Sequence, residues 1–149
     1  MRVCIDTAIL LDILKDESRP SQEIFYSALS SREALVVPVV VFAELLPQFG
    51  GDNKLTDSFL KEHKVHVEPL DLEDAIVAGR RWIRYLKAKT KSKCPGCGHP
   101  LAPKEHLLSD FYIGGFALTK CQAILTRDRG IYKKYFPELK GYGDCLGLP

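Results

Sequence analysis

Four acidic residues of this chain lie within or beside runs of apolar residues. Asp6 ends the apolar run Val3–Ile5, Glu44 lies inside Val39–Leu46, Asp110 precedes Phe111–Leu118, and Asp128 follows Ala123–Leu125 after two residues. An ionised carboxylate in apolar surroundings is costly unless it is paired or binds a cation. Clustered carboxylates supply the oxygen ligands that Mg²⁺ and Mn²⁺ prefer. The pattern therefore predicts a site for a divalent cation such as Mg²⁺ or Mn²⁺.

Each acid taken alone has a simpler explanation, because Asp is a common helix cap and carboxylates often pair with surface cations. That explanation is weaker for all four together, since Asp6 and Asp128 each follow an apolar run with strand character. Cys4 is the only Cys or His within these four segments, so zinc is a poor match for them.

The elements that must position these acids follow from the apolar periodicity. Strands are predicted at residues 2–5, 35–37, 65–67 and 122–125, and helices at about 8–14, 21–30, 39–49, 54–63, 72–87, 107–120 and 131–136. Thr7 is expected to cap the first helix, and Asp71 the helix from Leu72. Strands alternating with helices predict an α/β fold with a central parallel sheet, whose ligand site lies at the carboxyl ends of the strands.

The segments IDTAILLDIL, VVVFAELL, LLSDFYIGGFAL and ILTRDRGIY resemble the PIN domain, and specifically the VapC-type toxins of toxin–antitoxin pairs. The resemblance covers essentially the whole chain and implies one nuclease domain over residues 1–149, with a PIN-like three-layer α/β/α fold. It implies that Asp6, Glu44, Asp110 and Asp128 are the catalytic, metal-binding acids. Thr7 and Thr126 match hydroxyl positions that support these acids.

The same resemblance implies a metal-dependent endoribonuclease. Mg²⁺ or Mn²⁺ would activate a water molecule and stabilise the charge that develops at the scissile phosphate. Arg127 would neutralise a neighbouring phosphate, and a homodimer would bind a small antitoxin protein. The alternatives are a housekeeping RNA-processing nuclease and a catalytically inactive RNA- or protein-binding module. A dehalogenase-type phosphatase is disfavoured, because Asp6-Thr7-Ala8 lacks the Asp-x-Asp pattern.

A second motif, CPGCGH, lies in a polar, proline-containing arm at about residues 89–106. Its two thiols, Cys94 and Cys97, have the spacing of one zinc knuckle, but a structural zinc site needs four ligands. His99 and His106 would complete it within one chain, or two subunits would each supply a pair. An unmetallated, reduced loop is the alternative, and a redox role is less favoured because the motif lacks a thioredoxin-like setting.

Basic residues are concentrated beside this motif, with none of the acidic residues among them. The eight are Arg80, Arg81, Arg84, Lys87, Lys89, Lys91, Lys93 and Lys104. Subtracting 8 from 21 leaves 13 basic against 19 acidic residues, so the rest of the chain is acidic by six. The segment is a candidate RNA contact through Arg84, Lys87, Lys89, Lys91 and Lys93, and a solvated helix end is the alternative.

The composition of the 149 residues is that of a globular protein, with 46% hydrophobic and 27% charged residues. No apolar run approaches the roughly 20 residues that span a bilayer. Asp6 and Asp12 interrupt the apolar N-terminal stretch, which argues against a secretory signal peptide. A cytoplasmic location is therefore the expectation.

Overall fold

The computed structural model describes residues 1–89, 94–99 and 108–145. Its strands are β1 (Arg2–Ile5), β2 (Ala34–Pro38), β3 (Val65–Glu68) and β4 (Ala123–Leu125). Its helices are α1 (Thr7–Lys15), α2 (Arg19–Ser30), α3 (Val39–Leu45), the 3₁₀ helix η1 (Leu46–Phe49), α4 (Asn53–Glu62), α5 (Leu72–Lys89), α6 (Leu108–Lys120), α7 (Arg129–Tyr135) and α8 (Tyr142–Cys145). Lys91, Lys93, Lys104 and His106 lie outside the described residues, as does most of the predicted arm.

The four strands form one parallel sheet in the order β3-β2-β1-β4, which confirms the predicted α/β class. In register, Val3 of β1 is opposite Leu35 of β2 on one side and Ala123 of β4 on the other. The central position of β1 explains why its apolar residues are fully buried. Because β1 and β4 are parallel neighbours, the segments after them leave the sheet at the same edge.

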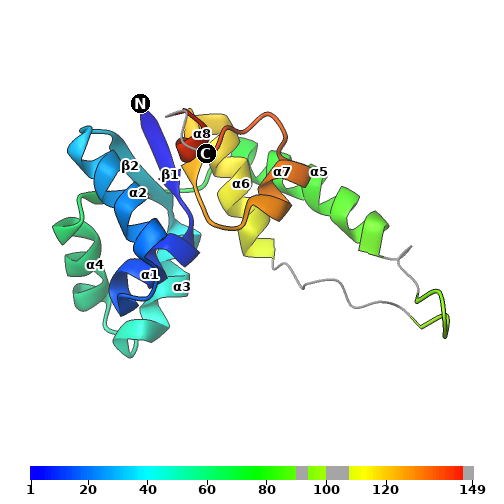
Figure 1. Cartoon of the computed structure of the whole chain (residues 1–149), viewed down its shortest axis with the longest axis horizontal. Helices are drawn as coiled ribbons and strands as arrows, with labels where there is room; N and C mark the ends of the chain where they lie inside the picture. Colours follow the sequence, from blue (N-terminus) through cyan, green and yellow to red (C-terminus); the bar gives the residue numbers. More distant parts are fainter. Residues whose placement is uncertain (90–93, 100–107, 146–149) are drawn as a thin grey trace.

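Helices cover both faces of the sheet (Figure 1). In Figure 1, α1, α2 and α4 lie on one side of the strands, and α5 and α6 lie on the other. This is the predicted three-layer arrangement, and it follows from the sequence because strands that are apolar throughout need cover on both faces. Within the described residues, no helix is long and apolar enough to span a bilayer.

A reciprocal cap fixes the beginning of α5. The Asp74 amide donates to Asp71 Oδ1 at 3.1 Å, and the Asp71 amide donates to Asp74 Oδ2 at 2.9 Å, which confirms Asp71 as the helix cap. The buried Asp74 carboxylate also pairs with Lys120 at 2.8 Å and accepts a hydrogen bond from Thr119, both on α6. These contacts hold α5 against α6, the helix that carries Asp110.

The two helices approach so closely that one position on α6 admits no side chain. A Cβ at Gly115 would lie 2.6 Å from the Asp74 carbonyl oxygen, and one at the adjacent Gly114 would lie 2.5 Å from the Phe136 ring. The Gly-Gly pair therefore allows α6 to pack against the backbone of α5 on one side and an aromatic ring on the other.

Candidate active site

Asp6 lies at the carboxyl end of β1, where the sheet passes into α1. Its amide donates to the Leu125 carbonyl at 3.0 Å, which extends the pairing of β1 with β4 by one residue. The backbone of Asp6 is extended, with φ −74° and ψ 147°, and its side chain forms no capping hydrogen bond to α1. The carboxylate instead accepts a hydrogen bond from Thr126 Oγ1 at 2.7 Å, and Asp6 is only 5% exposed.

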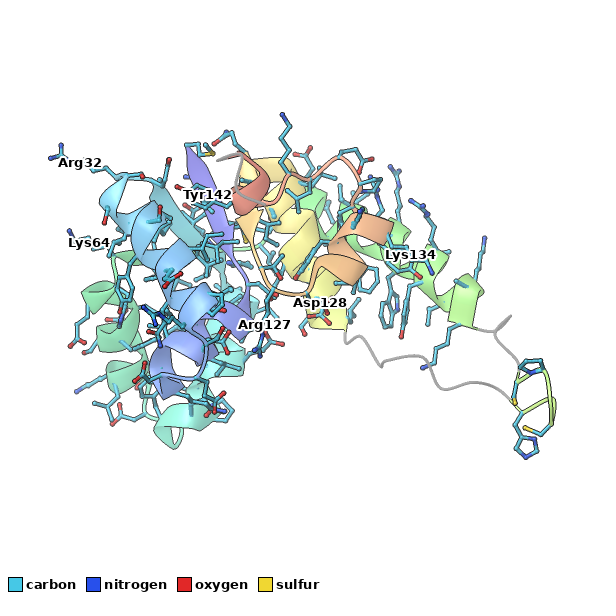
Figure 2. The ribbon with its side chains drawn as sticks, in the orientation of Figure 1. Arg32, Lys64, Arg127, Asp128, Lys134 and Tyr142 are labelled. Atoms are coloured by element: carbon cyan, nitrogen blue, oxygen red, sulfur yellow. The ribbon has the colours of Figure 1, made fainter. Side chains whose placement is uncertain are left out.

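Thr126 links the first acid to the fourth. While its hydroxyl donates to Asp6, its oxygen accepts a hydrogen bond from the Asp128 amide at 3.0 Å. Asp128 is the residue immediately before α7, and Figure 2 shows it beside Arg127 in the segment that follows β4. One hydroxyl thus ties the segments that carry Asp6 and Asp128, which are far apart in the sequence.

Two hydroxyl groups orient the carboxylate of Glu44 on α3. Thr7 Oγ1, at the beginning of α1, donates to Glu44 Oε2, and Ser109 Oγ, at the beginning of α6, donates to Oε1 at 2.7 Å. The expectation that Thr7 caps α1 is wrong, because Asp6 occupies the cap position and Thr7 is the first residue of the helix. Its hydroxyl faces Glu44 instead, so Glu44 joins the first turns of two helices from opposite layers.

The acids influence one another electrostatically. The pKa of Asp6 is raised to about 6, chiefly by burial and also by the negative charges of Asp110 and Glu44, while the hydrogen bond from Thr126 opposes the shift. Among the residues that the structure describes, no Lys or Arg forms an ion pair with Asp6 or Glu44. Within the described residues, no ion pair therefore offsets the negative charge of Asp6 and Glu44.

Tyr132 on α7 borders the same acids, although its place in the sequence did not predict a role there. Its phenol is 3% exposed, and its hydroxyl has no hydrogen-bond partner within the described part of the chain. Burial raises its pKa well above the usual range, and the carboxylates of Asp6, Asp110 and Asp128 contribute to the shift. The charges of Asp110 and Glu44 act on Asp6, and those of Asp6, Asp110 and Asp128 act on Tyr132. All four predicted acids therefore lie in one region, close enough to interact electrostatically.

Arg127 lies at the edge of this region and is held by an acid that was not among the predicted site residues. Its Nη1 lies 3.1 Å from Oδ1 of Asp12 on α1, an ion pair rather than a directed hydrogen bond. Asp12 is 1% exposed and its other oxygen accepts a hydrogen bond from Ser21 at 2.6 Å. An acid within the apolar run of α1 was the available signal, of the same kind that identified Glu44.

The basic residues of α5 differ in their surroundings. Arg81 pairs with Glu138 at 2.9 Å and donates to the Tyr135 carbonyl, so it serves packing. Trp82 stacks on Tyr85 and contacts the Phe111 ring edge at 5.0 Å between centroids, so its ring packs within the protein. The side chains of Arg84, Lys87 and Lys89 are exposed near the end of α5.

The three described members of the predicted zinc set lie in a tight turn within residues 94–99. Across all described residues, no group of three or more His, Cys, Asp or Glu side chains is arranged so that it could hold a metal ion. Neither the predicted acids nor the cysteine turn forms such a group among these residues.

Comparisons with known proteins agree with this fold. A chain of VapBC2 from Rickettsia felis, solved bound to a DNA fragment from their promoter, superposes with a TM-score of 0.64 at 14% identity, covering 94% of this chain and 96% of that one. VapBC-1 from nontypeable Haemophilus influenzae gives a TM-score of 0.64 at 19% identity, covering 95% and 98%. No curated protein matches the chain in sequence.

The model of the PIN domain matches residues 3–137, nearly the whole length of the chain. The matched range includes all four predicted acids, Thr7 and Thr126, and the whole sheet except Arg2, the first residue of β1. With the parallel sheet and the acids at its carboxyl edge already established from the structure, the chain belongs to the PIN-domain family.

Proposed function

We propose that this protein is a metal-dependent endoribonuclease of the VapC toxin type, which hydrolyses RNA phosphodiester bonds at the cluster of Asp6, Glu44, Asp110 and Asp128. The observation that carries the proposal is the buried carboxylate of Asp6, which has neighbouring acids and no ion-paired Lys or Arg in the described chain. A charge arrangement that is costly by itself is typical of a site built to bind a cation.

The donor set suits Mg²⁺ or Mn²⁺, because it consists of carboxylate oxygens and contains neither His nor a thiol ligand. A closed set of protein ligands is unnecessary for Mg²⁺, which commonly keeps several waters and takes one or two carboxylates. Asp6, Glu44, Asp110 and Asp128 would hold the ion. When bound, it would supply an activated water and neutralise charge at the scissile phosphate.

The other polar residues would hold the acids in place. Thr126 fixes one oxygen of Asp6, while Thr7 and Ser109 fix the two oxygens of Glu44. The hydroxyl of Thr126 lowers the pKa of Asp6 and so favours the ionised form that a cation requires, while the hydroxyls of Thr7 and Ser109 orient the carboxylate of Glu44. Arg127 is 57% exposed although it pairs with Asp12, so its guanidinium is accessible to a phosphate at the edge of the site.

The direct test is a cleavage assay on single-stranded RNA with Mg²⁺ or Mn²⁺, with and without a chelator. Cleavage should require the metal and should fall about a hundred-fold or more in Glu44→Gln, since even the outer-shell partners of metal ligands typically contribute about ten- to a hundred-fold. Glu62→Gln, at an exposed position, is the matched control. Metal-independent cleavage, or none by the wild-type chain with either ion, would contradict the nuclease proposal and favour an inactive binding module.

The VapBC proteins found by structural comparison support a small antitoxin as the partner of this chain. A homodimer is supported by an apolar row on one face of α5, in which Leu72, Ile76, Ile83 and Leu86 are all exposed. Light scattering should report a dimer at micromolar concentration, and Ile83→Lys should shift it to monomer. A wild-type monomer would remove the dimer from the proposal.

A housekeeping RNA-processing role would be indicated if the protein cleaves RNA but no small partner protein suppresses cleavage.

Thr126→Val should lower metal-dependent cleavage by about ten- to a hundred-fold, because the hydroxyl that holds Asp6 and receives the Asp128 amide is absent. The acidic limb of the rate profile should also move to higher pH, since that hydroxyl lowers the pKa of Asp6. Rates measured from pH 5 to 8 would show both effects. Thr126→Ser keeps the hydroxyl and should behave as wild type, and a Val variant with an unshifted profile would exclude this role.

Replacing Lys87, Lys89, Lys91 and Lys93 with Gln should weaken RNA binding and flatten its dependence on salt. Removing one cation from the RNA backbone should reduce the log–log slope by up to about 0.7 for single-stranded RNA. The rate of cleavage at saturating RNA should change little, because the four lysines are not part of the proposed catalytic cluster of acids. Fluorescence anisotropy at several salt concentrations measures the slope, and a fourfold replacement of Lys15, Lys54, Lys61 and Lys64 is the control. An unchanged slope would show that the segment does not bind RNA.

A further inference from the structure

The CPGCGH segment folds as a closed turn. The Cys94 amide donates to the His99 carbonyl at 2.7 Å, and the Gly98 amide donates to the Cys94 carbonyl at 2.9 Å. Gly98 has φ +71°, a left-handed conformation that residues with a side chain adopt at a cost. These main-chain contacts bring the ends of the six-residue segment together and leave both cysteines on one turn.

The two thiols lie three residues apart on this turn. A Cβ at Gly96, between them, would lie 4.0 Å from Cys94 Sγ, so the turn folds back toward that sulfur. Both thiols are free, Cys97 is exposed and Cys94 is half-buried. The geometry is that of a turn that presents two sulfur ligands to one ion.

Two ligands do not complete a zinc site. Structural zinc takes four ligands in a tetrahedron, most often from Cys and His. His99 does not supply the third, since in the described residues no third His, Cys, Asp or Glu side chain is grouped with the two thiols. A second copy of the chain can supply a matching pair, and a two-fold axis through the ion would relate the two halves.

We propose that Cys94 and Cys97 form one half of a tetrathiolate zinc site, which is completed by Cys94 and Cys97 of a second copy of this chain. Zinc bound in this way would join two copies at their basic segments. The inference does not depend on the proposed nuclease activity, because none of the four acids is a ligand.

The charge of the chain around the turn favours such a site. Eight cations and no acid lie between Arg80 and Lys104, so two copies brought together here would repel each other. Zn²⁺ with four thiolates carries a net charge of −2, which offsets part of that repulsion. A site of two thiolates and two neutral imidazoles would have no net charge, so it would not offset the repulsion between the two basic segments.

Cobalt and zinc binding to the full-length chain test the proposal. The protein is reduced with a phosphine under anaerobic conditions, so that no added thiol competes for metal. Co²⁺ should saturate at half an ion per chain, with the intense sulfur-to-metal and d–d absorption of a tetrahedral tetrathiolate. Native mass spectrometry after loading with Zn²⁺ should find no zinc in single chains, and in larger species no more than one zinc for every two chains.

Cys97→Ser should abolish both signals, whereas Cys121→Ser, outside the turn, should retain them. Helical circular dichroism and thermal unfolding of both variants establish that the fold is intact, which is expected because the turn is exposed. Saturation at one ion per chain, zinc in a single chain, a mixed nitrogen–sulfur spectrum, or equal binding by Cys97→Ser would each overturn the shared tetrathiolate. Failure of RNA cleavage would leave these results unaffected.

Discussion

Asp6→Asn is expected to lower metal-dependent RNA cleavage about a thousand-fold while raising the stability of the metal-free protein at pH 8. The loss of activity follows from removing the charge of the most buried of the four predicted acids, and a thousand-fold corresponds to about 4 kcal/mol of transition-state stabilisation. The gain in stability also comes from removing the charge of Asp6. A buried carboxylate beside Asp110 and Glu44 is unfavourable in the ionised form when no cation is bound.

The pH range of the stability effect follows from the pKa of Asp6. The value is about 6 in the folded chain, against 3.8 for an ordinary Asp, so the folded chain binds more protons between these values. Stability therefore falls as the pH rises from about 4 to about 6, and above that range the ionised carboxylate costs at most about 3 kcal/mol. Asn carries no charge at any of these values, so the variant should gain stability relative to wild type only as the pH rises.

Urea unfolding at pH 5 and pH 8, with a chelator and with Mg²⁺, measures this linkage. Mg²⁺ should stabilise the wild type and have little effect on Asp6→Asn, because an ion that binds only the folded chain stabilises it by mass action. Asp16→Asn is the control, since Asp16 is exposed and its φ of +53° is one that Asn tolerates. Full activity in Asp6→Asn, with unchanged stability at both pH values, would remove Asp6 from the site.

Gly115→Ala should destabilise the protein by about 3 kcal/mol, because the added methyl group has no space. Its Cβ would lie 2.6 Å from the Asp74 carbonyl oxygen and 3.1 Å from the Ala78 amide nitrogen, both in the backbone of α5. A backbone cannot turn aside as a side chain does, so α5 and α6 would have to separate. Gly79→Ala on α5 is the matched control, since nothing lies within 4 Å of its Cβ. It should raise stability by about 0.5–1 kcal/mol through helix propensity.

Urea unfolding of the two variants would give opposite shifts in midpoint. Because α6 begins two residues before Asp110, separation of α5 from α6 should also lower cleavage by Gly115→Ala, whereas Gly79→Ala should remain active. A loss of stability below about 0.5 kcal/mol in Gly115→Ala would show that the two helices are farther apart than in this structure.

The amino-acid sequence alone determined the strands, the parallel sheet and which residues follow its strand ends. Apolar runs with strand or helix periodicity depend on local spacing, which is why β1 and β4 were predicted within one residue of their positions. Asp71 was likewise predicted as a cap, because a cap is satisfied within the next few residues. The edge at which Asp6 and Asp128 lie follows from parallel pairing once both are known to follow strands.

Only the tertiary structure decided what each polar group contacts. The hydroxyl of Thr7 donates to Glu44 rather than capping α1, and Ser109 donates to the same carboxylate from a position 65 residues away. The pairing of Arg127 with the buried Asp12 also joins two segments that are far apart in the sequence. Local spacing specifies which face of an element a residue occupies, whereas a partner from another layer is specified only by how the layers pack. The raised pKa of Asp6 is decided at that level too, since burial and neighbouring charge exist only in the folded chain.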